Sequence, residues 1–345
     1  MALLVQIEKR LGDFHLDAAF ETEGETLALL GASGCGKSMT LKCIAGIVRP
    51  DRGRIVLNGR VLFDSEQGIN LPPQKRRVGY LFQQYALFPH MTVEENIAVG
   101  LWTRDRAARK TAVAEKIKAF RLEGLETLRP AQLSGGQQQR TALARILASE
   151  PEVLLLDEPF SALDDHLRWQ LELELMDVLR DFSGDTVFVS HRKDEVRRLC
   201  QNVTVLTAGK TDPVTTVRAL LERPRTVGEA RLAGCRNLSQ TVRLGERRVF
   251  CKDWGVELET AEPVPENAAF AAIRDGGLRP SDGPDNQIDC RVSRVVRDMD
   301  TVILMLAAPG GGLLRMELPM AEWEALGCPE ALTAAVCPAD ILLLT

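Results

Sequence analysis

The first 225 residues alternate between short apolar runs and stretches with helical spacing. Residues 14–20 place Phe14, Leu16, Ala18 and Phe20 on one side of an extended chain, which predicts a strand in an opening hairpin. The apolar run 26–30 stops at a glycine-rich turn, and residues 38–47 then show helical spacing. The order strand, loop, helix is the context in which glycine-rich loops bind phosphate.

The same alternation continues further along the chain. Residues 94–148 have a helical pattern, whereas the brief apolar runs 153–156 and 186–189 are typical of buried parallel strands. Between those two runs leucine recurs every four residues, which predicts a helix over 162–182. The leucines are Leu163, Leu167, Leu171, Leu175 and Leu179. We therefore predict an α/β fold with a parallel sheet and an inserted helical subdomain at about 86–148.

The character of the sequence changes after about residue 225. Prolines punctuate short strand-like runs such as 248–251 and 302–306, and a hairpin is predicted over 301–318 with its turn at 309–312. The sequence therefore predicts two domains, residues 1–225 and a small, mainly β domain at residues 226–345.

Charge and composition exclude several classes of protein. The net charge is −5, and residues 226–345 contribute 12 Lys and Arg against 18 Asp and Glu, so we expect no binding of nucleic acid through bulk charge. No apolar run reaches the length of a membrane span and the N-terminus lacks a signal-peptide pattern, so we expect a cytoplasmic protein. The eight cysteines contain no C-x-x-C spacing, which argues against a zinc site or a disulfide framework.

Residues 31–38 match the phosphate-loop pattern G-x-x-x-x-G-K-[ST] at every fixed position. They are Gly31, Ala32, Ser33, Gly34, Cys35, Gly36, Lys37 and Ser38. In such a loop the backbone N–H groups bind phosphate, the lysine ammonium reaches the β- and γ-phosphates and the serine hydroxyl ligates Mg²⁺. The loop predicts a nucleoside triphosphate as ligand.

The run 153–159 reads VLLLDEP, an apolar strand that ends in two adjacent carboxylates. Asp157 is the candidate Mg²⁺ ligand, and Glu158 is the candidate general base that faces an attacking water.

Residues 133–137 read LSGGQ, shortly before the acidic strand. Together with the phosphate loop, this sequence resembles the ATP-binding subunits of ABC transporters. The resemblance implies a P-loop ABC ATPase domain in which the LSGGQ segment completes the ATP site of the opposite subunit, so ATP is sandwiched in a homodimer. The residues of this segment are Leu133, Ser134, Gly135, Gly136 and Gln137.

The resemblance also assigns roles to further positions of this chain. Gln83 matches the glutamine that joins Mg²⁺ and water to the permease, and His191 matches the switch histidine near the γ-phosphate. With Glu158 and Lys37 they form the expected catalytic set. Ser161, Ala162, Leu163 and Asp164 match a loop at the dimer interface.

Two positions near the ATP site leave questions open. Phe14 is the candidate that stacks on adenine, although Leu11 lies near the same place and Phe14 could be a core residue. Met39 follows the loop serine where the family often has threonine, so one contact to phosphate is missing.

Residues 8–16 and 47–60 resemble the molybdate and sulfate importer branch of this family, as do the tail segments 230–240, 253–259 and 271–280. That branch implies a C-terminal TOBE/MOP-like domain with an oligonucleotide-binding-type fold, which assists dimerisation or binds a regulatory oxyanion. Arg274, Arg279 and Arg291 are the candidate anion donors, and structural capping is the simpler role. The branch also implies integral-membrane permease subunits, an extracytoplasmic solute-binding protein and a location on the inner face of the membrane.

Three alternatives remain at this point. The first is an importer ATPase for another solute, such as Fe³⁺, a sugar or a polyamine. The second is a soluble ABC ATPase without a transporter, which the single LSGGQ and the lack of extended heptads disfavour. The third is an oxyanion-sensing regulatory protein, against which the complete ATPase residue set argues.

Overall fold

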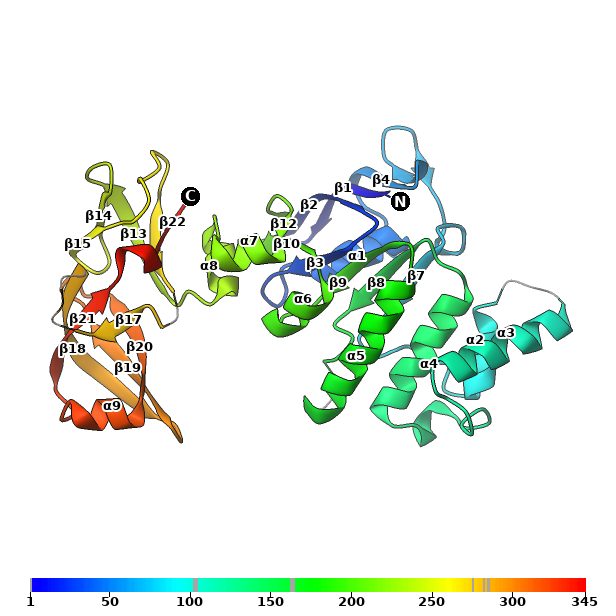
Figure 1. Ribbon diagram of the computed structural model, residues 1–345. Coiled ribbons are helices and arrows are strands. Elements are labelled where there is room, and N and C mark those ends of the chain that lie inside the picture. Colours follow the sequence, from blue (N-terminus) through cyan, green and yellow to red (C-terminus); the bar gives the residue numbers. More distant parts are fainter. Residues whose placement is uncertain (1, 102–104, 162–164, 275, 282, 284–285) are drawn as a thin grey trace. The chain divides into compact units, whose positions relative to one another are not determined.

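The computed structural model describes residues 2–101, 105–161, 165–274, 276–281, 283 and 286–345. The chain divides into two compact units, Met1–Val217 and Arg218–Thr345 (Figure 1). The boundary predicted from the sequence, after Arg225, comes slightly later. Helix α7 (Val217–Glu222) begins at the division.

Unit 1 is built on one sheet with the strand order β6-β5-β4-β1-β2-β11-β10-β3-β9-β8-β7, in which β12 also pairs with β10. The antiparallel half contains β1 Ala2–Leu11, β2 Phe14–Glu23, β4 Arg52–Leu57, β5 Arg60–Asp64 and β6 Ile69–Asn70. The parallel half contains β3 Thr26–Leu30, β7 Val78–Leu81, β8 Val153–Asp157, β9 Asp185–Val189 and β10 Asn202–Thr207. Two short strands, β11 Lys210–Thr211 and β12 Thr215–Thr216, complete the sheet.

The hydrophobic patterns explain this sheet. Strands β1 and β2 pair antiparallel as the predicted hairpin, and Leu16, Ala18 and Phe20 are buried while His15 and Ala19 are exposed. Every residue of β3, β8 and β9 is buried, as expected for parallel strands covered on both faces. The α/β fold with a parallel sheet is confirmed.

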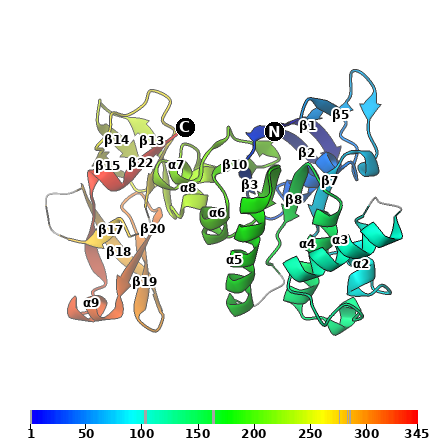
Figure 2. The same cartoon turned by 45° about the vertical axis from the view of Figure 1, so that its right-hand side comes forward.

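Helices flank the parallel strands. They are α1 Lys37–Ala45, α2 Val93–Val99, α3 Arg106–Ala119, α4 Gly135–Ala148, α5 Asp165–Asp181 and α6 Lys193–Leu199, with 3₁₀ turns η1 Pro73–Lys75 and η2 Pro130–Gln132. Helices α2, α3 and α4 contact one another and form a helical group beside the sheet (Figure 2). Among its described residues, the region read as one helical stretch contains the three α-helices α2, α3 and α4. Helix α5 contains Leu167, Leu171, Leu175 and Leu179 of the leucine repeat, with Leu171 and Leu175 buried, whereas Leu163 lies outside the described residues.

A buried arginine anchors the helix that follows the phosphate loop. Arg76 is fully buried, and its Nη1 donates to the carbonyls of Cys43 and Ile44 at 2.9 and 2.8 Å, in the last turn of α1. A cation at a helix C-terminus interacts favourably with the helix dipole. Burial lowers the pKa of Arg76 to about 10. A Cβ at Gly46 would meet Arg76 Nε at 2.5 Å, so this position requires glycine.

Unit 2 is mainly β, as predicted. Its two five-stranded sheets have the orders β15-β14-β13-β16-β22 and β17-β21-β18-β19-β20. The strands are β13 Asn237–Arg243, β14 Arg248–Cys251, β15 Val256–Glu259, β16 Phe270–Ile273, β17 Leu278–Pro280, β18 Asn286–Arg297, β19 Thr301–Ala307, β20 Leu313–Pro319, β21 Ala331–Val336 and β22 Ile341–Leu344. Helices α8 Val227–Ala233 and α9 Met320–Ala325 and the turn η3 Pro338–Asp340 accompany them.

The core of unit 2 contains Trp254 and Trp323, both nearly inaccessible to solvent. Strands β19 and β20 form the predicted hairpin. All eight cysteines of the chain are free thiols and six of them are buried. None of the helices that the structure describes combines the length and hydropathy that a membrane span requires.

Candidate ATP site

The phosphate loop connects β3 to α1, as the sequence predicted. The side chain of Lys37 is buried, and its Nζ donates to the carbonyls of Gly31 and Ala32 at 2.8 and 2.9 Å. These two bonds hold the start of the loop against the Lys37 ammonium group. Ala32, Ser33 and Gly34 are exposed at the loop surface.

Two glycines make this loop possible. A Cβ at Gly31 would meet the carbonyl oxygen of Leu206 at 2.3 Å and Cys35 Sγ at 2.6 Å. Gly36 has φ 111°, and a Cβ there would lie 3.0 Å from the ring of Phe14. Both positions exclude a larger residue for steric reasons. Cys35 is buried, with its Sγ 3.8 Å from Lys37 Nζ, and Met39 packs against the core.

Two of the three predicted Mg²⁺ ligands, Ser38 and Asp157, are hydrogen-bonded to each other, whereas the third, Gln83, donates to Glu158. Ser38 Oγ donates to Asp157 Oδ1 at 2.9 Å, and the hydroxyl of Tyr80 donates to Asp157 Oδ2 at 2.9 Å. Carboxylate and hydroxyl oxygens are suitable ligands for Mg²⁺. Tyr80 lies on β7, and its pKa is raised by burial and by the neighbouring carboxylate. The sequence analysis missed Tyr80, because nothing in its local pattern distinguishes it from a packed strand residue.

We expect Tyr80→Phe to lower the free energy of unfolding by about 1–3 kcal/mol, because a charged acceptor loses a buried donor. Tyr85→Phe is the matched control, since its hydroxyl donates only a long bond of 3.4 Å to the neutral carbonyl of Pro159. Urea unfolding midpoints of the two variants measure the difference. Equal losses in the free energy of unfolding would contradict the interpretation that Asp157 is a charged acceptor of the Tyr80 hydrogen bond.

Three residues of the expected catalytic set converge. Gln83 Nε2 donates to Glu158 Oε2 at 3.3 Å, and His191 Nδ1 lies 3.6 Å from Glu158 Oε1. The backbone of Glu158 has φ 46°, in the left-handed region, which for a non-glycine residue costs about 1–3 kcal/mol. The N–H of Glu158 donates to the carbonyl of Val189 at 3.0 Å, which fixes the carboxylate beside the end of β9.

The LSGGQ segment begins helix α4. Ser134 is the N-cap: its Oγ accepts from the N–H of Gln137 at 3.3 Å, and its own N–H donates to Gln137 Oε1 at 2.9 Å. A hydroxyl that accepts this bond still has its proton to donate. Gly135 and Gly136 form the first turn, and Leu133 is buried. The segment therefore presents a serine hydroxyl and a helix N-terminus, a suitable combination for an anion.

The remaining predicted positions are found in different surroundings. Ser161 Oγ donates to the carbonyl of Glu158 at 3.0 Å, whereas Ala162, Leu163 and Asp164 lie outside the described residues. Leu11 and Phe14 are cross-strand partners at the tip of the first hairpin, Leu11 exposed and Phe14 half-buried against the core.

The three tail arginines proposed as anion donors differ in their surroundings. The guanidinium of Arg274 donates to the backbone carbonyls of Leu221 and Glu222. Arg279 and Arg291 are exposed, on β17 and β18.

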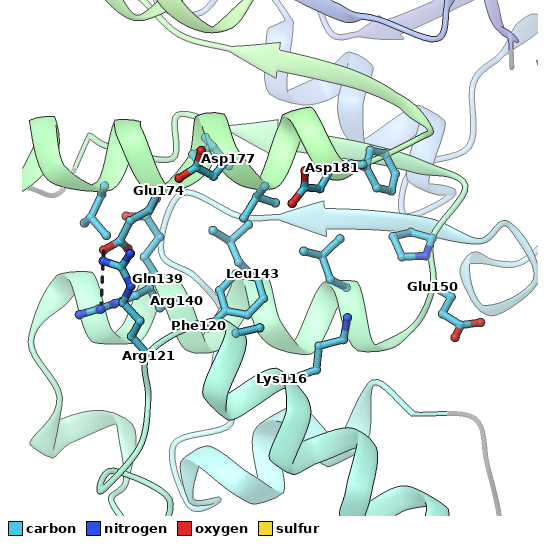
Figure 3. Close-up of a pocket in the computed structure, with 17 residues that line it drawn as sticks. Lys116, Phe120, Arg121, Gln139, Arg140, Leu143, Glu150, Glu174, Asp177 and Asp181 are labelled. Carbon is cyan, nitrogen blue, oxygen red and sulfur yellow. Dashed lines mark ion pairs between the residues drawn. The ribbon is translucent and has the colours of Figure 1, made fainter.

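Within unit 1, a hollow of about 500 Å³ lies between the end of α3, α4 and α5 (Figure 3). At one end Arg121 and Arg140 approach Glu174 Oε1 at 3.6 and 3.8 Å. Aliphatic and aromatic side chains such as Leu143 and Phe120 line the rest. None of the residues predicted to bind ATP lines it.

Comparisons with known proteins show what this chain is similar to. A family model described as ABC transporter matches residues 19–161. The chain is 38% identical over 324 residues to the spermidine/putrescine import ATP-binding protein PotA of Rubrobacter xylanophilus, which covers 90% of this chain and 84% of that protein. It is 41% identical over 235 residues to the molybdenum import ATP-binding protein ModC of Rhizobium etli, covering 68% and 66%. It is 37% identical over 347 residues to the sulfate/thiosulfate import ATP-binding protein CysA of Burkholderia pseudomallei, covering 95% of each.

Solved structures give the same fold. A dimeric ATP-binding cassette bound to ADP and Pi has 27% identity and a TM-score of 0.53, and covers 63% of this chain and 99% of its own. A dimeric bacterial ABC transporter cassette has 28% identity and a TM-score of 0.54, with the same coverage.

A phosphate loop between a buried strand and a helix, facing a strand that ends in two carboxylates, defines a P-loop nucleoside triphosphatase. The chain belongs to the ABC transporter family: it is the ATP-binding subunit of an importer and an ATPase.

Proposed function

We propose that this ATPase drives the uptake of an oxyanion, molybdate or sulfate, through a separate permease. The similarity to the sulfate/thiosulfate relative supports an oxyanion because it extends over 95% of both chains and so includes unit 2. The molybdenum relative is similar over 68% of this chain.

The observation that carries the mechanism is the convergence of Gln83 and His191 on Glu158. Glu158 acts as the general base toward the attacking water. Gln83 orients that water through its amide, and His191 contacts the γ-phosphate from the end of the neighbouring strand. Because hydrolysis of ATP depends largely on positioning and charge stabilisation, three groups held together can act on the attacking water and on the phosphate that it attacks.

The phosphate loop holds the nucleotide. Lys37 exchanges its bonds to loop carbonyls for bonds to the β- and γ-phosphates, and the loop N–H groups bind the remaining phosphate oxygens. Ser38 and Asp157, assisted by Gln83, would hold Mg²⁺, which when bound would supply positive charge against the negative charge on the phosphates. Phe14 contacts the adenine at the hairpin tip.

Two copies of the chain form the working unit. Leu133, Ser134, Gly135, Gly136 and Gln137 of one copy close the ATP site of the other, and the loop 161–164 lies at the interface. Support comes from the capped N-terminus of α4, which presents hydroxyl and backbone donors to an anion, and from the similar cassette, which is dimeric in both of its solved structures.

We assign the ATPase domain to residues 1–225 and the TOBE/MOP-like domain to residues 226–345, which make up most of unit 2. Its first role is to cap the ATPase domain structurally and to assist dimerisation. An oxyanion would bind there through local donors, with Arg274, Arg279 and Arg291 as the candidates; the guanidinium of Arg274 also donates to two backbone carbonyls.

The assembly contains partners that this chain does not supply. Permease subunits carry the solute across the membrane, and an extracytoplasmic binding protein delivers it. The chain itself is then cytoplasmic and peripheral, held on the inner face of the membrane by the permease, with no nucleic-acid partner.

A polyamine is the second candidate solute, because the spermidine/putrescine relative is similar over 90% of this chain. The experiment co-expresses the chain with permease and binding-protein genes adjacent to its own and reconstitutes the complex in liposomes. We expect ATPase stimulation of roughly tenfold or more by binding protein with molybdate or sulfate, and none with spermidine. If only spermidine stimulates ATP hydrolysis, the solute is a polyamine and the oxyanion assignment is wrong. A complex that hydrolyses ATP but transports neither molybdate, sulfate nor spermidine would also refute that assignment.

A further inference from the structure

The loops after β8 and β9 carry Glu158 and His191, and beyond one backbone hydrogen bond they are connected through side chains. The backbone bond runs from the N–H of Glu158 to the carbonyl of Val189. Beneath them lies a small cavity of about 50 Å³, lined by residues from both loops and from α5 and α6. They are Glu158, Phe160, Ser161, Arg168, Ser190, His191, Arg192 and Glu195.

Glu195 holds the histidine loop from below. It lies on α6 and is 3% exposed, and its Oε2 accepts from Ser190 Oγ at 2.6 Å. Ser190 Oγ in turn accepts from the N–H of Arg192 at 3.0 Å. The residues on both sides of His191 are therefore attached to one buried carboxylate.

Arg168 extends this attachment to the loop of the catalytic carboxylate. It lies on α5 with its side chain 11% exposed, and its Nε donates to the carbonyl of Phe160 at 3.4 Å. The same Nε lies 3.9 Å from Glu195 Oε1. Phe160 is two residues after Glu158 and is fully buried, so a shift of its carbonyl shifts the segment that carries Glu158.

The two helices have a second ion pair that does not reach these loops. Arg198 on α6 donates to Glu172 Oε2 on α5 through Nε at 2.7 Å, and its Nη2 lies 2.6 Å from the same oxygen. Glu172 is 2% exposed, so this pair already joins α5 to α6. Arg168 and Glu195 add contacts to both catalytic loops. They do so although burying a second carboxylate, that of Glu195, costs desolvation energy.

We propose that Arg168 and Glu195 are positioning residues for ATP hydrolysis, which keep the Glu158 loop and the His191 loop in register beneath the γ-phosphate. The inference rests on the roles given to Glu158 and His191 under the proposed function. Without the contacts of Arg168 and Glu195 the two loops could shift slightly. Because such a small shift of catalytic groups can slow a reaction up to about 100-fold, we expect the pair to affect the rate of the chemical step.

The test measures steady-state ATP hydrolysis by Arg168→Gln and Glu195→Gln in the full chain. We expect kcat to fall roughly tenfold to 100-fold while KM for ATP changes less than about twofold. Arg168→Lys keeps the positive charge but not the Nε donor of a planar guanidinium, so it should recover part of kcat. The double variant should lose little more than either single variant, as expected for two residues of one network.

The matched control is Glu172→Gln with Arg198→Gln, which removes the other ion pair between the same helices. A purely structural role predicts that both pairs lower the melting temperature and leave kcat per folded molecule unchanged. That result would overturn the proposal. If Arg168→Gln fails to fold, Ser190→Ala tests the same network without removing a charge, and its kcat should fall while KM is retained.

The outcome also separates this proposal from the proposed function. An inactive Glu158→Gln together with fully active Arg168→Gln and Glu195→Gln refutes the positioning role alone. Substantial activity in Glu158→Gln would instead refute the assignment of the base on which both depend.

Discussion

Glu158→Gln is expected to lower kcat for ATP hydrolysis by roughly 100-fold to 10,000-fold. The amide is the same size as the carboxylate and can keep a contact with Gln83, but it cannot accept a proton from water. Binding of ATP depends on Lys37 and the phosphate loop and should be retained. Phosphate release in the steady state measures the rate, and size-exclusion chromatography with ATP measures the dimer that should accumulate.

Asp181→Asn is the control for Glu158→Gln. Asp181 has a side chain 81% exposed at the end of α5, so removing its charge should leave kcat unchanged. A Glu158→Gln variant that hydrolyses ATP at nearly the wild-type rate would show that another group acts as the base.

Lys37→Ala is expected to weaken ATP binding at least about 100-fold, because the phosphates lose a charged donor whose hydrogen bonds are each worth about 1.5–3 kcal/mol. The variant also loses the two bonds from Nζ to Gly31 and Ala32, which shape the loop. Titration with a fluorescent ATP analogue measures the affinity.

Lys42→Ala is the control for Lys37→Ala. Lys42 lies in the last turn of the same helix, α1, away from the phosphate loop. It should bind ATP as the wild type does. Equal affinities of the Lys37→Ala and Lys42→Ala variants for ATP would show that Lys37 does not bind the phosphates. Backbone groups alone would then hold the nucleotide.

The net charge is distributed unevenly between the two units. Unit 2 holds most of the excess acid, so the ATPase unit is close to neutral and attracts ATP through its loop and helix N-terminus. An oxyanion would need local donors in unit 2 to overcome that charge. Salt should therefore affect the appendage more than the ATP site.

Contiguous motifs could be found from the sequence because each is a local structure. The phosphate loop depends on Gly31 and Gly36, whose positions leave no room for a side chain, and Ser134 with Gln137 forms a capping box within one helical turn. Strands β3, β8 and β9 were readable because every residue in them is buried. In the helical region, the spacing indicated helix but could not show where α2, α3 and α4 begin and end.

The sequence by itself determined the phosphate loop, the acidic strand end, the LSGGQ helix start and a mainly β tail, because spacing and side-chain chemistry act within a few residues. Only the tertiary structure decided which distant groups meet. Ser38, Tyr80 and Asp157 come together because β7 and β8 are neighbours and α1 packs against β8. Arg168 reaches Glu195 because α5 packs on α6. Strand order and helix packing depend on how all the core side chains pack together. They therefore cannot be read from any single segment of the sequence.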